Sequence, residues 1–442
     1  MISEIRLANF KCFKQLSLPL GMFTLLTGLN GMGKSSVIQS ILLMRQSWLS
    51  GDLKTGRLAL NGELTELGTG YDVLFEGADA DQVGIGLNAY TKTEAGMSSK
   101  IAIDFWYSYD QKSDRLTSIL PDIAVNREMK NILSSSHFET VQELIQDPAS
   151  LATLKIIAST EEQGLLWQGI SQLQAQDQWI KAVEREAISP FGGQFHYVFA
   201  ERFGPRKMLP LSETHVRGEN LGLHGEYVLH FLLEYGKKIL LDHDDPRLFS
   251  KPEIPRSLEA QVDAWLQEIS PGSHLSIEAI RKADSVLSGF EFDRPGDIKT
   301  RAFRATNVGF GLSYVLPVIV ALLSAEKGAM VLLENPEAHM HPRGQTRLGQ
   351  LAARTAAAGV QVIMETHSDH IMDGARIDIR QGGIGRLAAA HAAFHYFERE
   401  GAMAKVTSPN ISDDGRLDNW PAGFFDQHDE NLIELLAPKT KG

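Results

Sequence analysis

The sequence is short of cysteine and of positive charge. Its one cysteine, Cys12, can form neither an intrachain disulfide nor a multi-cysteine metal site, which suits a reducing compartment. The 43 Lys and Arg residues stand against 55 Asp and Glu, which gives a formal net charge of −12. Nonspecific wrapping around nucleic acid is therefore not expected of the whole surface, although a local basic patch is compatible with this charge.

The sequence also has no apolar run long enough to cross a bilayer. The most apolar run, residues 312–324, is shorter than the roughly 20 residues that a membrane-spanning helix needs, and it predicts a buried core helix. Residues 2–7 have a strand-like pattern in place of a charged-then-apolar signal segment. We therefore expect a cytoplasmic protein that does not associate with a membrane.

Composition shifts along the chain predict three regions of an α/β protein with a mixed sheet. Residues 1–110 are strand-like, and Gly, Asn and Asp between short apolar runs predict β hairpins at about 59–107. Residues 111–290 turn polar, which predicts a largely helical insertion followed by return strands. Residues 291–442 hold the remaining core signals. No heptad run long enough for a coiled-coil arm is present.

The strongest motif is Gly28-Leu29-Asn30-Gly31-Met32-Gly33-Lys34-Ser35, which matches the phosphate-binding pattern G-x-x-x-x-G-K-[ST]. An apolar strand precedes it and helical spacing follows it, as phosphate binding requires. Lys34 is expected to reach the β- and γ-phosphates of ATP, and the Ser35 hydroxyl to bind Mg²⁺. The residues expected to bind the nucleotide are Asn30, Gly31, Met32, Gly33, Lys34, Ser35 and Ser36.

A second motif begins with the apolar run 330–333 and ends in Glu334-Asn335-Pro336-Glu337. An acid at the end of such a strand can meet Mg²⁺ at the carboxyl edge of a sheet, so Glu334 is the expected metal ligand. Asn335 has no useful basicity and cannot act as a general base. Either Glu337 or another acid is then expected to polarise the attacking water, or hydrolysis is slow.

Two further segments are candidates for contacts with the γ-phosphate. An apolar strand delivers His367 into a loop, where it either senses the γ-phosphate or is simply a polar residue. Small residues, Gly309, Gly311 and Ser313, open the apolar helix that precedes the second motif. They form either a second anion site or a plain helix cap, and sequence order alone favours neither.

In this order the motifs resemble the ABC/SMC superfamily of ATPases, and within it the heads of OLD-family and Septu-type phage-defence proteins. The opening strand Ile5–Phe13 and the loop Gly28–Ser36 carry this resemblance. Gly309–Ser313 stands where the ABC signature sits, and His367 where the switch histidine sits. The resemblance implies an ABC-type head, ATP and Mg²⁺ as ligands, and a homodimer or larger homo-oligomer in which the signature of one subunit completes the phosphate site of another.

The sequence departs from that pattern in three places. ABC-type heads usually carry Asp then Glu at the end of the second motif, and here the pair is Glu334-Asn335. The signature has no literal Leu-Ser-Gly-Gly-Gln, and residues 72–75, in the likely Q-loop region, lack a glutamine. These departures favour slow turnover, with ATP mainly holding a closed state.

Other polar clusters have two interpretations each. Arg202, Arg206 and Lys207 could contact nucleic acid, nucleotide or an acidic partner, but a solvated turn with ion pairs explains them equally well. His339 and His341 could bind a metal, but subunit contacts are the more common use of this loop in the resembled family.

We therefore hypothesise an ATPase that acts as a nucleotide-dependent conformational switch, in bacterial phage defence or DNA maintenance, with a separate effector such as a nuclease. The alternative is a nucleotide-binding regulatory scaffold with negligible turnover, which Asn335 favours. A transporter ATPase is disfavoured by the atypical signature, and a GTPase by the lack of an Asn-Lys-x-Asp motif.

Overall fold

A computed structural model of the chain describes residues 1–92, 98–125, 191–249, 251, 253–296, 298–401, 403–421 and 423–437. Most of the predicted helical insertion, residues 126–190, lies outside the described residues. The chain divides into two compact units, the first formed by 1–19 and 36–193, the second by 20–35 and 194–442. The predicted boundaries at residues 110 and 290 stay predictions.

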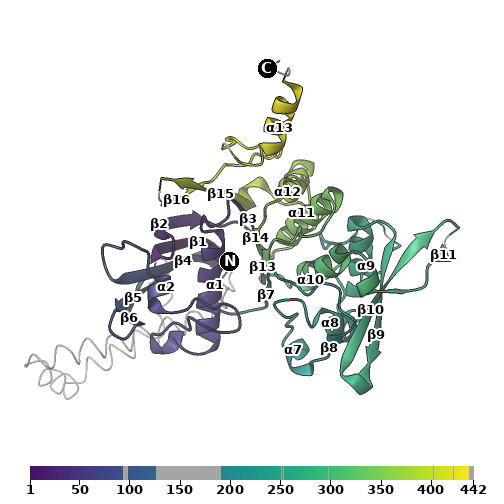
Figure 1. The fold of residues 1–442 in the computed structure, drawn as a ribbon, viewed down its shortest axis with the longest axis horizontal. Helices are drawn as coiled ribbons and strands as arrows, with labels where there is room; N and C mark the ends of the chain where they lie inside the picture. The colour runs from purple at the N-terminus through teal and green to yellow at the C-terminus, as the bar shows by residue number, and fades with distance from the viewer. Residues whose placement is uncertain are drawn as a thin grey trace, which may run out of the picture. The chain divides into compact units, whose positions relative to one another are not determined.

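The first unit contains a five-stranded antiparallel sheet with strand order β2-β1-β4-β5-β6 (Figure 1). Its strands are β1 (Ile2–Phe10), β2 (Phe13–Pro19), β4 (Gln82–Lys92), β5 (Ser98–Asp110) and β6 (Arg115–Val125). The predicted hairpins are formed by β4 and β5, whereas residues 59–81 are mostly turns around the short helix α2 (Gly70–Val73). Helix α1 (Lys34–Leu49) begins in the second unit and continues into the first.

The second unit is built on a six-stranded sheet with strand order β16-β15-β3-β14-β13-β7. These strands are β3 (Phe23–Gly28), β7 (Phe195–Val198), β13 (Met330–Glu334), β14 (Gln361–Glu365), β15 (Ala392–Glu400) and β16 (Met403–Thr407). All neighbours pair in parallel except the edge strand β16. The central strands β13 and β14 are buried throughout, which explains why their sequences are continuous apolar runs.

Helix α10 (Phe310–Ser324) precedes β13 in the chain, α11 (Pro342–Ala357) follows β13, and α12 (Asp369–Gln381) follows β14. Val318, Leu351, Val331 and Met364 belong to one core cluster formed by helices and sheet. As predicted, the apolar run at 312–324 is a buried helix. Within the described residues, no helix is both long and apolar enough to cross a membrane.

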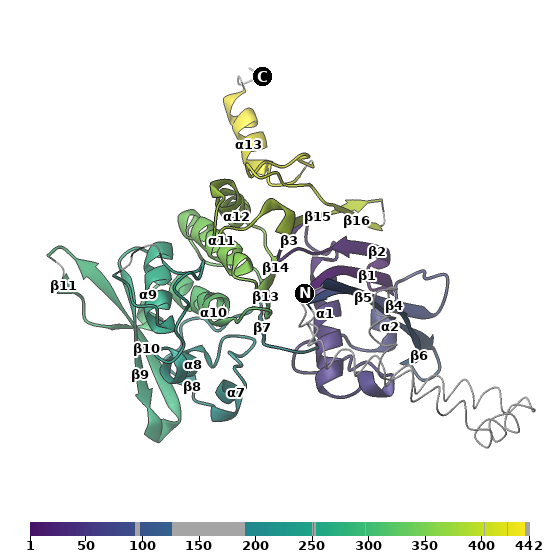
Figure 2. The same cartoon turned by 180° about the vertical axis from the view of Figure 1, so that it is seen from behind.

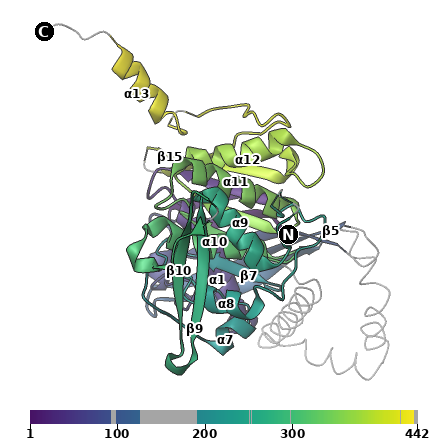
Figure 3. The ribbon, with the colours of Figure 1, turned by 90° about the vertical axis from the view of Figure 1, so that its right-hand side faces the viewer.

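A smaller antiparallel sheet joins the same unit. Its long hairpin is formed by β9 (Ser273–Ile280) and β10 (Ser285–Arg294), which lie side by side in Figure 3. The short strands β8 (Leu209–Pro210), β11 (Ile298–Lys299) and β12 (Phe303–Arg304) pair with β10. The chain is thus a mixed α/β protein with several sheets, as the sequence predicted.

The remaining helices of this unit are short. They are α7 (Glu213–Arg217), α8 (Val228–Tyr235), α9 (Leu258–Ile269) and α13 (Gln427–Leu436), the last of which projects from its unit in Figure 2. Short 3₁₀ turns occur in both units, at Leu53–Thr55, Arg281–Ala283, Ala305–Asn307 and Ala389–His391.

Candidate nucleotide-binding site

The phosphate-binding motif forms a tight loop between the end of β3 and the start of α1. Gly28, Gly31 and Gly33 have positive φ angles of 124°, 75° and 99°, which favour glycine. A Cβ on Gly28 would lie 2.1 Å from the backbone oxygen of Phe397 on β15, so no side chain fits there. Asn30 and Gly31 are exposed at the loop's tip, and Met32 is half-buried. The loop therefore presents backbone amides beside the N-terminus of a 16-residue helix, an arrangement that binds phosphate.

Lys34 lies inside the curve of this loop. Its ammonium donates to the backbone oxygens of Gly28 at 3.0 Å and Leu29 at 2.8 Å. Its side chain is only 3% exposed, and its Nζ lies 3.8 Å from Glu365 Oε1. Burial lowers the pKa of Lys34, and the Glu365 carboxylate counteracts part of that effect.

Ser35 contacts an acid that the sequence analysis did not identify. Its hydroxyl donates to Glu365 Oε2 at 3.0 Å. Glu365 is the last residue of β14 and is 7% exposed. Burial raises its pKa, whereas Lys34 and the bond from Ser35 lower it. An acid ending an apolar strand was the signal that identified Glu334, and the same signal is present at Glu365. Ser36, the next residue of α1, is the first residue of this helix that belongs to the first unit.

Glu334 ends the neighbouring strand β13 and is also 7% exposed. The Tyr197 hydroxyl on β7 donates to its Oε1 at 2.8 Å. Burial raises the pKa of Glu334 to about 7, although the bond from Tyr197 favours the ionised form. Tyr197 was not predicted as a site residue, because the sequence does not reveal that β7 pairs with β13.

Arg202 secures the backbone that follows Glu334. Its guanidinium donates to the backbone oxygens of Glu334 at 2.8 Å and Asn335 at 2.7 Å. It is 2% exposed, so of the two interpretations of this cluster the solvated turn was wrong for Arg202. Arg206 and Lys207 do remain exposed, with the Arg206 guanidinium 5.0 Å from the centre of the Phe203 ring.

The loop after Glu334 brings Asn335, Glu337 and His367 together. Asn335 adopts a left-handed backbone with φ 43°, and its backbone N–H donates to the backbone oxygen of Glu365 at 2.9 Å. Glu337 Oε1 accepts from the backbone amide of His367 at 2.8 Å. Asn335 Oδ1 and Glu337 Oε2 are buried without a hydrogen-bond partner among the described residues.

His367 follows Thr366 in the loop after β14, and its side chain is exposed. Partial burial and the charge on Lys34 lower the pKa of His367, and Glu337 opposes them. A ring held neutral can donate from one nitrogen and accept at the other. The structure thus gathers Lys34, Ser35, Glu334, Glu337 and His367 at one edge of the sheet, together with Asn335 and Glu365.

The candidate signature residues lie at the start of α10. Gly309 is the N-cap and Ser313 lies within the first turns of the helix, so the cap interpretation of Ser313 was wrong. A Cβ on Gly311 would lie 2.6 Å from the backbone oxygen of His339, so Gly311 packs against that loop. Whether Gly309, Gly311 and Ser313 bind phosphate stays a prediction.

The two histidines after Glu337 have structural roles. The ring of His339 packs against those of Phe310 and Tyr314. His341 caps α11, where its Nδ1 accepts from the backbone amide of Arg343 at 3.3 Å. In the part of the chain that the structure describes, no three His, Cys, Asp or Glu side chains group as a metal site. Magnesium sites of nucleotide-binding proteins commonly need only one or two carboxylates, with phosphates and water completing the shell.

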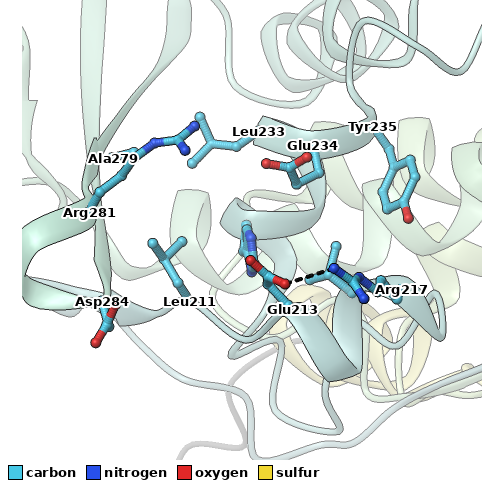
Figure 4. Close-up of a pocket in the computed structure, with 11 residues that line it drawn as sticks. Leu211, Glu213, Arg217, Leu233, Glu234, Tyr235, Ala279, Arg281 and Asp284 are labelled. Atoms are coloured by element: carbon cyan, nitrogen blue, oxygen red, sulfur yellow. Dashed lines mark hydrogen bonds and ion pairs between the residues drawn. The ribbon is translucent and has the colours of Figure 1, made fainter.

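A separate pocket of about 480 Å³ lies between α7, α8 and the turn from β9 to β10 (Figure 4). The Glu213–Arg217 ion pair, at 2.9 Å, lies on one side of it, and Arg281 and Asp284 on the other. None of the residues that gather around Lys34 lines this pocket.

Two families of ATPase domains match the chain. Residues 1–163 match the family described as "AAA ATPase domain", and residues 155–373 match "AAA domain, putative AbiEii toxin, Type IV TA system". Residues 387–435 match "Protein of unknown function (DUF3696)". Together, the two AAA matches span residues 1–373. The chain is therefore a P-loop ATPase-domain protein. No curated protein matches it.

Several solved structures are similar to this chain at low identity. The Smc head bound to the C-winged helix domain of ScpA has 14% identity and a TM-score of 0.48, over 93% of this chain and 98% of that one. The Smc head with an extended coiled coil from Pyrococcus furiosus, bound to the C-terminal domain of ScpA, has 13% identity and a TM-score of 0.41, over 99% of both chains. The SMC head from Thermotoga maritima has 10% identity and a TM-score of 0.40, over 92% of this chain and 98% of that one.

Proposed function

We propose that this chain binds Mg²⁺-ATP at Gly28–Ser36 and hydrolyses it slowly, as a nucleotide-dependent conformational switch in the cytoplasm. The observation that carries the proposal is the convergence of Lys34 and Ser35 with two buried acids, Glu334 and Glu365, at the carboxyl edge of a parallel sheet. Ligands of α/β sheets bind outside this edge, and helix N-termini there favour phosphate.

The donors at this edge fit a magnesium ion. Ser35 and Glu334 offer hard oxygen atoms, which are the ligands that Mg²⁺ prefers. When bound, Mg²⁺ neutralises charge on the β- and γ-phosphates. The ammonium of Lys34 supplies a second positive charge, and the amides of residues 30–35 donate to phosphate oxygens. Arg202 and Tyr197 hold Glu334 in place, the first through its backbone and the second through its carboxylate.

Glu337 is the side chain best suited to orient the attacking water. Asn335 cannot take up a proton, whereas Glu337 has a buried carboxylate oxygen, Oε2, that no described residue engages in a hydrogen bond. Its other oxygen is fixed by the amide of His367. A carboxylate with one oxygen fixed and the other without a hydrogen-bond donor can accept a hydrogen bond from a water molecule and polarise it.

Single-turnover hydrolysis tests the proposal. We expect wild-type protein in excess over ATP to release phosphate slowly, and Glu337→Gln to bind ATP while releasing phosphate at least about tenfold more slowly. Glu326→Gln replaces an exposed acid outside the site and is the matched control. A wild-type protein that binds ATP without turnover would instead support the regulatory scaffold.

We further propose that ATP promotes a homodimer in which Gly309, Gly311 and Ser313 of one subunit face the phosphates bound by another. This rests on the ABC/SMC resemblance and on the position of these residues at a helix start. Sedimentation of Glu337→Gln with Mg²⁺-ATP should show a species of about twice the monomer mass. A single monomeric species with and without ATP would contradict the proposal.

For the biological role we propose bacterial phage defence or DNA maintenance, acting through a separate effector such as a nuclease. The toxin–antitoxin description of the family matching residues 155–373 supports defence. Co-purification of a nuclease with Glu337→Gln but not with Lys34→Ala would connect the effector to bound ATP. Recovery of the same partner with both variants would argue against a nucleotide switch.

A further inference from the structure

Glu365 has contacts that a purely structural acid does not need. Both of its carboxylate oxygens face Ser35 Oγ, at 3.0 and 3.4 Å, and one lies 3.8 Å from Lys34 Nζ. These partners are the two side chains of the phosphate loop that are expected to bind phosphate and metal. We propose that Glu365 is a magnesium-site carboxylate that acts together with Ser35. This assignment rests on the proposed binding of Mg²⁺-ATP.

The spacing of the two oxygen atoms fits one shared metal ion. Magnesium takes six oxygen ligands in near-octahedral geometry at about 2.0–2.1 Å, so neighbouring ligand atoms lie about 3 Å apart. Ser35 Oγ and Glu365 Oε2 are 3.0 Å apart. A cation that binds the hydroxyl oxygen can therefore reach this carboxylate, directly or through one of its waters, without displacing the backbone of β14.

The strand register places Glu365 as well as Glu334 to bind a metal ion at the phosphate loop. β14 pairs with β3 on one side and with β13 on the other, so its last residue lies between the phosphate loop and Glu334. Glu334 Oε1 is already engaged by Tyr197. Of the two buried acids, Glu365 is the one in contact with the Ser35 hydroxyl.

Two other roles for Glu365 make different predictions. A carboxylate beside Lys34 could act as an anion that competes with phosphate, in which case its removal would strengthen nucleotide binding with and without magnesium. A structural role would leave the magnesium dependence of binding unchanged. The metal role predicts a change only in the magnesium dependence.

The experiment measures binding of a non-hydrolysable ATP analogue as free Mg²⁺ is varied, and again in EDTA. We expect Glu365→Gln to raise the Mg²⁺ concentration at half-maximal binding roughly ten- to hundredfold, with affinity in EDTA unchanged. The control Glu326→Gln should match the wild type. Substituting Mn²⁺ and recording its electron paramagnetic resonance gives a direct count of bound metal, which should fall in Glu365→Gln at intermediate metal concentration.

Tighter binding of Glu365→Gln in EDTA, or an unchanged Mg²⁺ midpoint, would overturn the assignment. Glu365→Asp keeps the charge and replaces Glu365→Gln if the latter does not fold; its midpoint should rise as well, because its carboxylate is one methylene farther from Ser35. A wild-type protein that does not bind the analogue, or a Lys34→Ala variant that binds it equally well, would instead refute the proposed function.

Discussion

Glu334 and Glu365 stand directly opposite each other, each as the last residue of its strand, in the parallel register of β13 and β14. β14 also pairs with β3, where Glu365 lies opposite Leu26, two residues before the phosphate loop. Strand order therefore brings two acids from distant parts of the sequence to the loop that carries Lys34. The chemistry of the site follows from this edge of the sheet.

Tyr197→Phe should make the Glu334 side chain harder to ionise, while the aromatic ring at position 197 keeps its packing. The lost hydrogen bond favours the ionised acid, so its removal raises the pKa of Glu334 further above its present value of about 7. The pH at which Mg²⁺-dependent ATP binding reaches half its maximum should therefore shift upward. A pH series of binding titrations measures this, with Tyr235→Phe as the control. An unchanged pH profile would exclude a role for ionised Glu334.

Arg202→Lys should destabilise the protein although it keeps the charge. A lysine cannot donate at once to the carbonyls of Phe199, Glu334 and Asn335, which Arg202 now satisfies. Buried carbonyls left without donors cost about 3 kcal/mol in the free energy of unfolding. Urea unfolding measures the loss, and the exposed Arg206→Lys should change stability by less than about 0.5 kcal/mol. Equal stability of both variants would contradict the role given to Arg202.

Substitutions at Asn335 should show how much of its contribution to stability comes from its backbone conformation. With φ at 43°, the residue has a left-handed backbone that Gly and Asn tolerate, whereas a β-branched residue does not. Asn335→Val should lose about 1–2 kcal/mol more in unfolding free energy than Asn335→Gly. Thermal and urea unfolding of the pair give this difference. A valine variant as stable as the glycine variant would show that the loop does not hold this conformation.

His196 should make the protein less stable in acid. Burial lowers the pKa of this ring to about 4, whereas an unfolded histidine takes up its proton near pH 6.5. The unfolded state therefore binds more protons as the pH falls from about 6.5 to 4, and the unfolding free energy should decrease by at most about 3 kcal/mol across that window.

Unfolding measured at several pH values above and below 6.5 checks this, with His196→Asn as the comparison. The variant lacks the titrating ring, so its stability should decline less steeply between pH 6.5 and 4, whatever its absolute stability. Parallel declines in both proteins would assign the acid sensitivity to other groups.

Much of the site could be predicted because local patterns determine it. The glycines and Lys34 form a motif whose backbone geometry needs no distant partner, and the apolar run before Glu334 identifies a buried strand. The two residues missed, Tyr197 and Glu365, and the buried position of Arg202 depend on which strands are neighbours. Tyr197 reaches Glu334 only because β7 pairs with β13, and Arg202 is buried only because its turn folds over the end of β13. Such pairings are long-range and leave no periodic signal in the sequence.

The most direct test of the account is calorimetric titration of ATP, with Mg²⁺ present, into the wild type, Lys34→Ala and the exposed-lysine control Lys207→Ala. We expect saturable binding by the wild type and by Lys207→Ala, and an affinity at least about tenfold lower for Lys34→Ala, since the ammonium is a charge-assisted donor to phosphate. A wild type that does not bind ATP, or equal binding by all three proteins, would contradict the claim that Gly28–Ser36 is a nucleotide site.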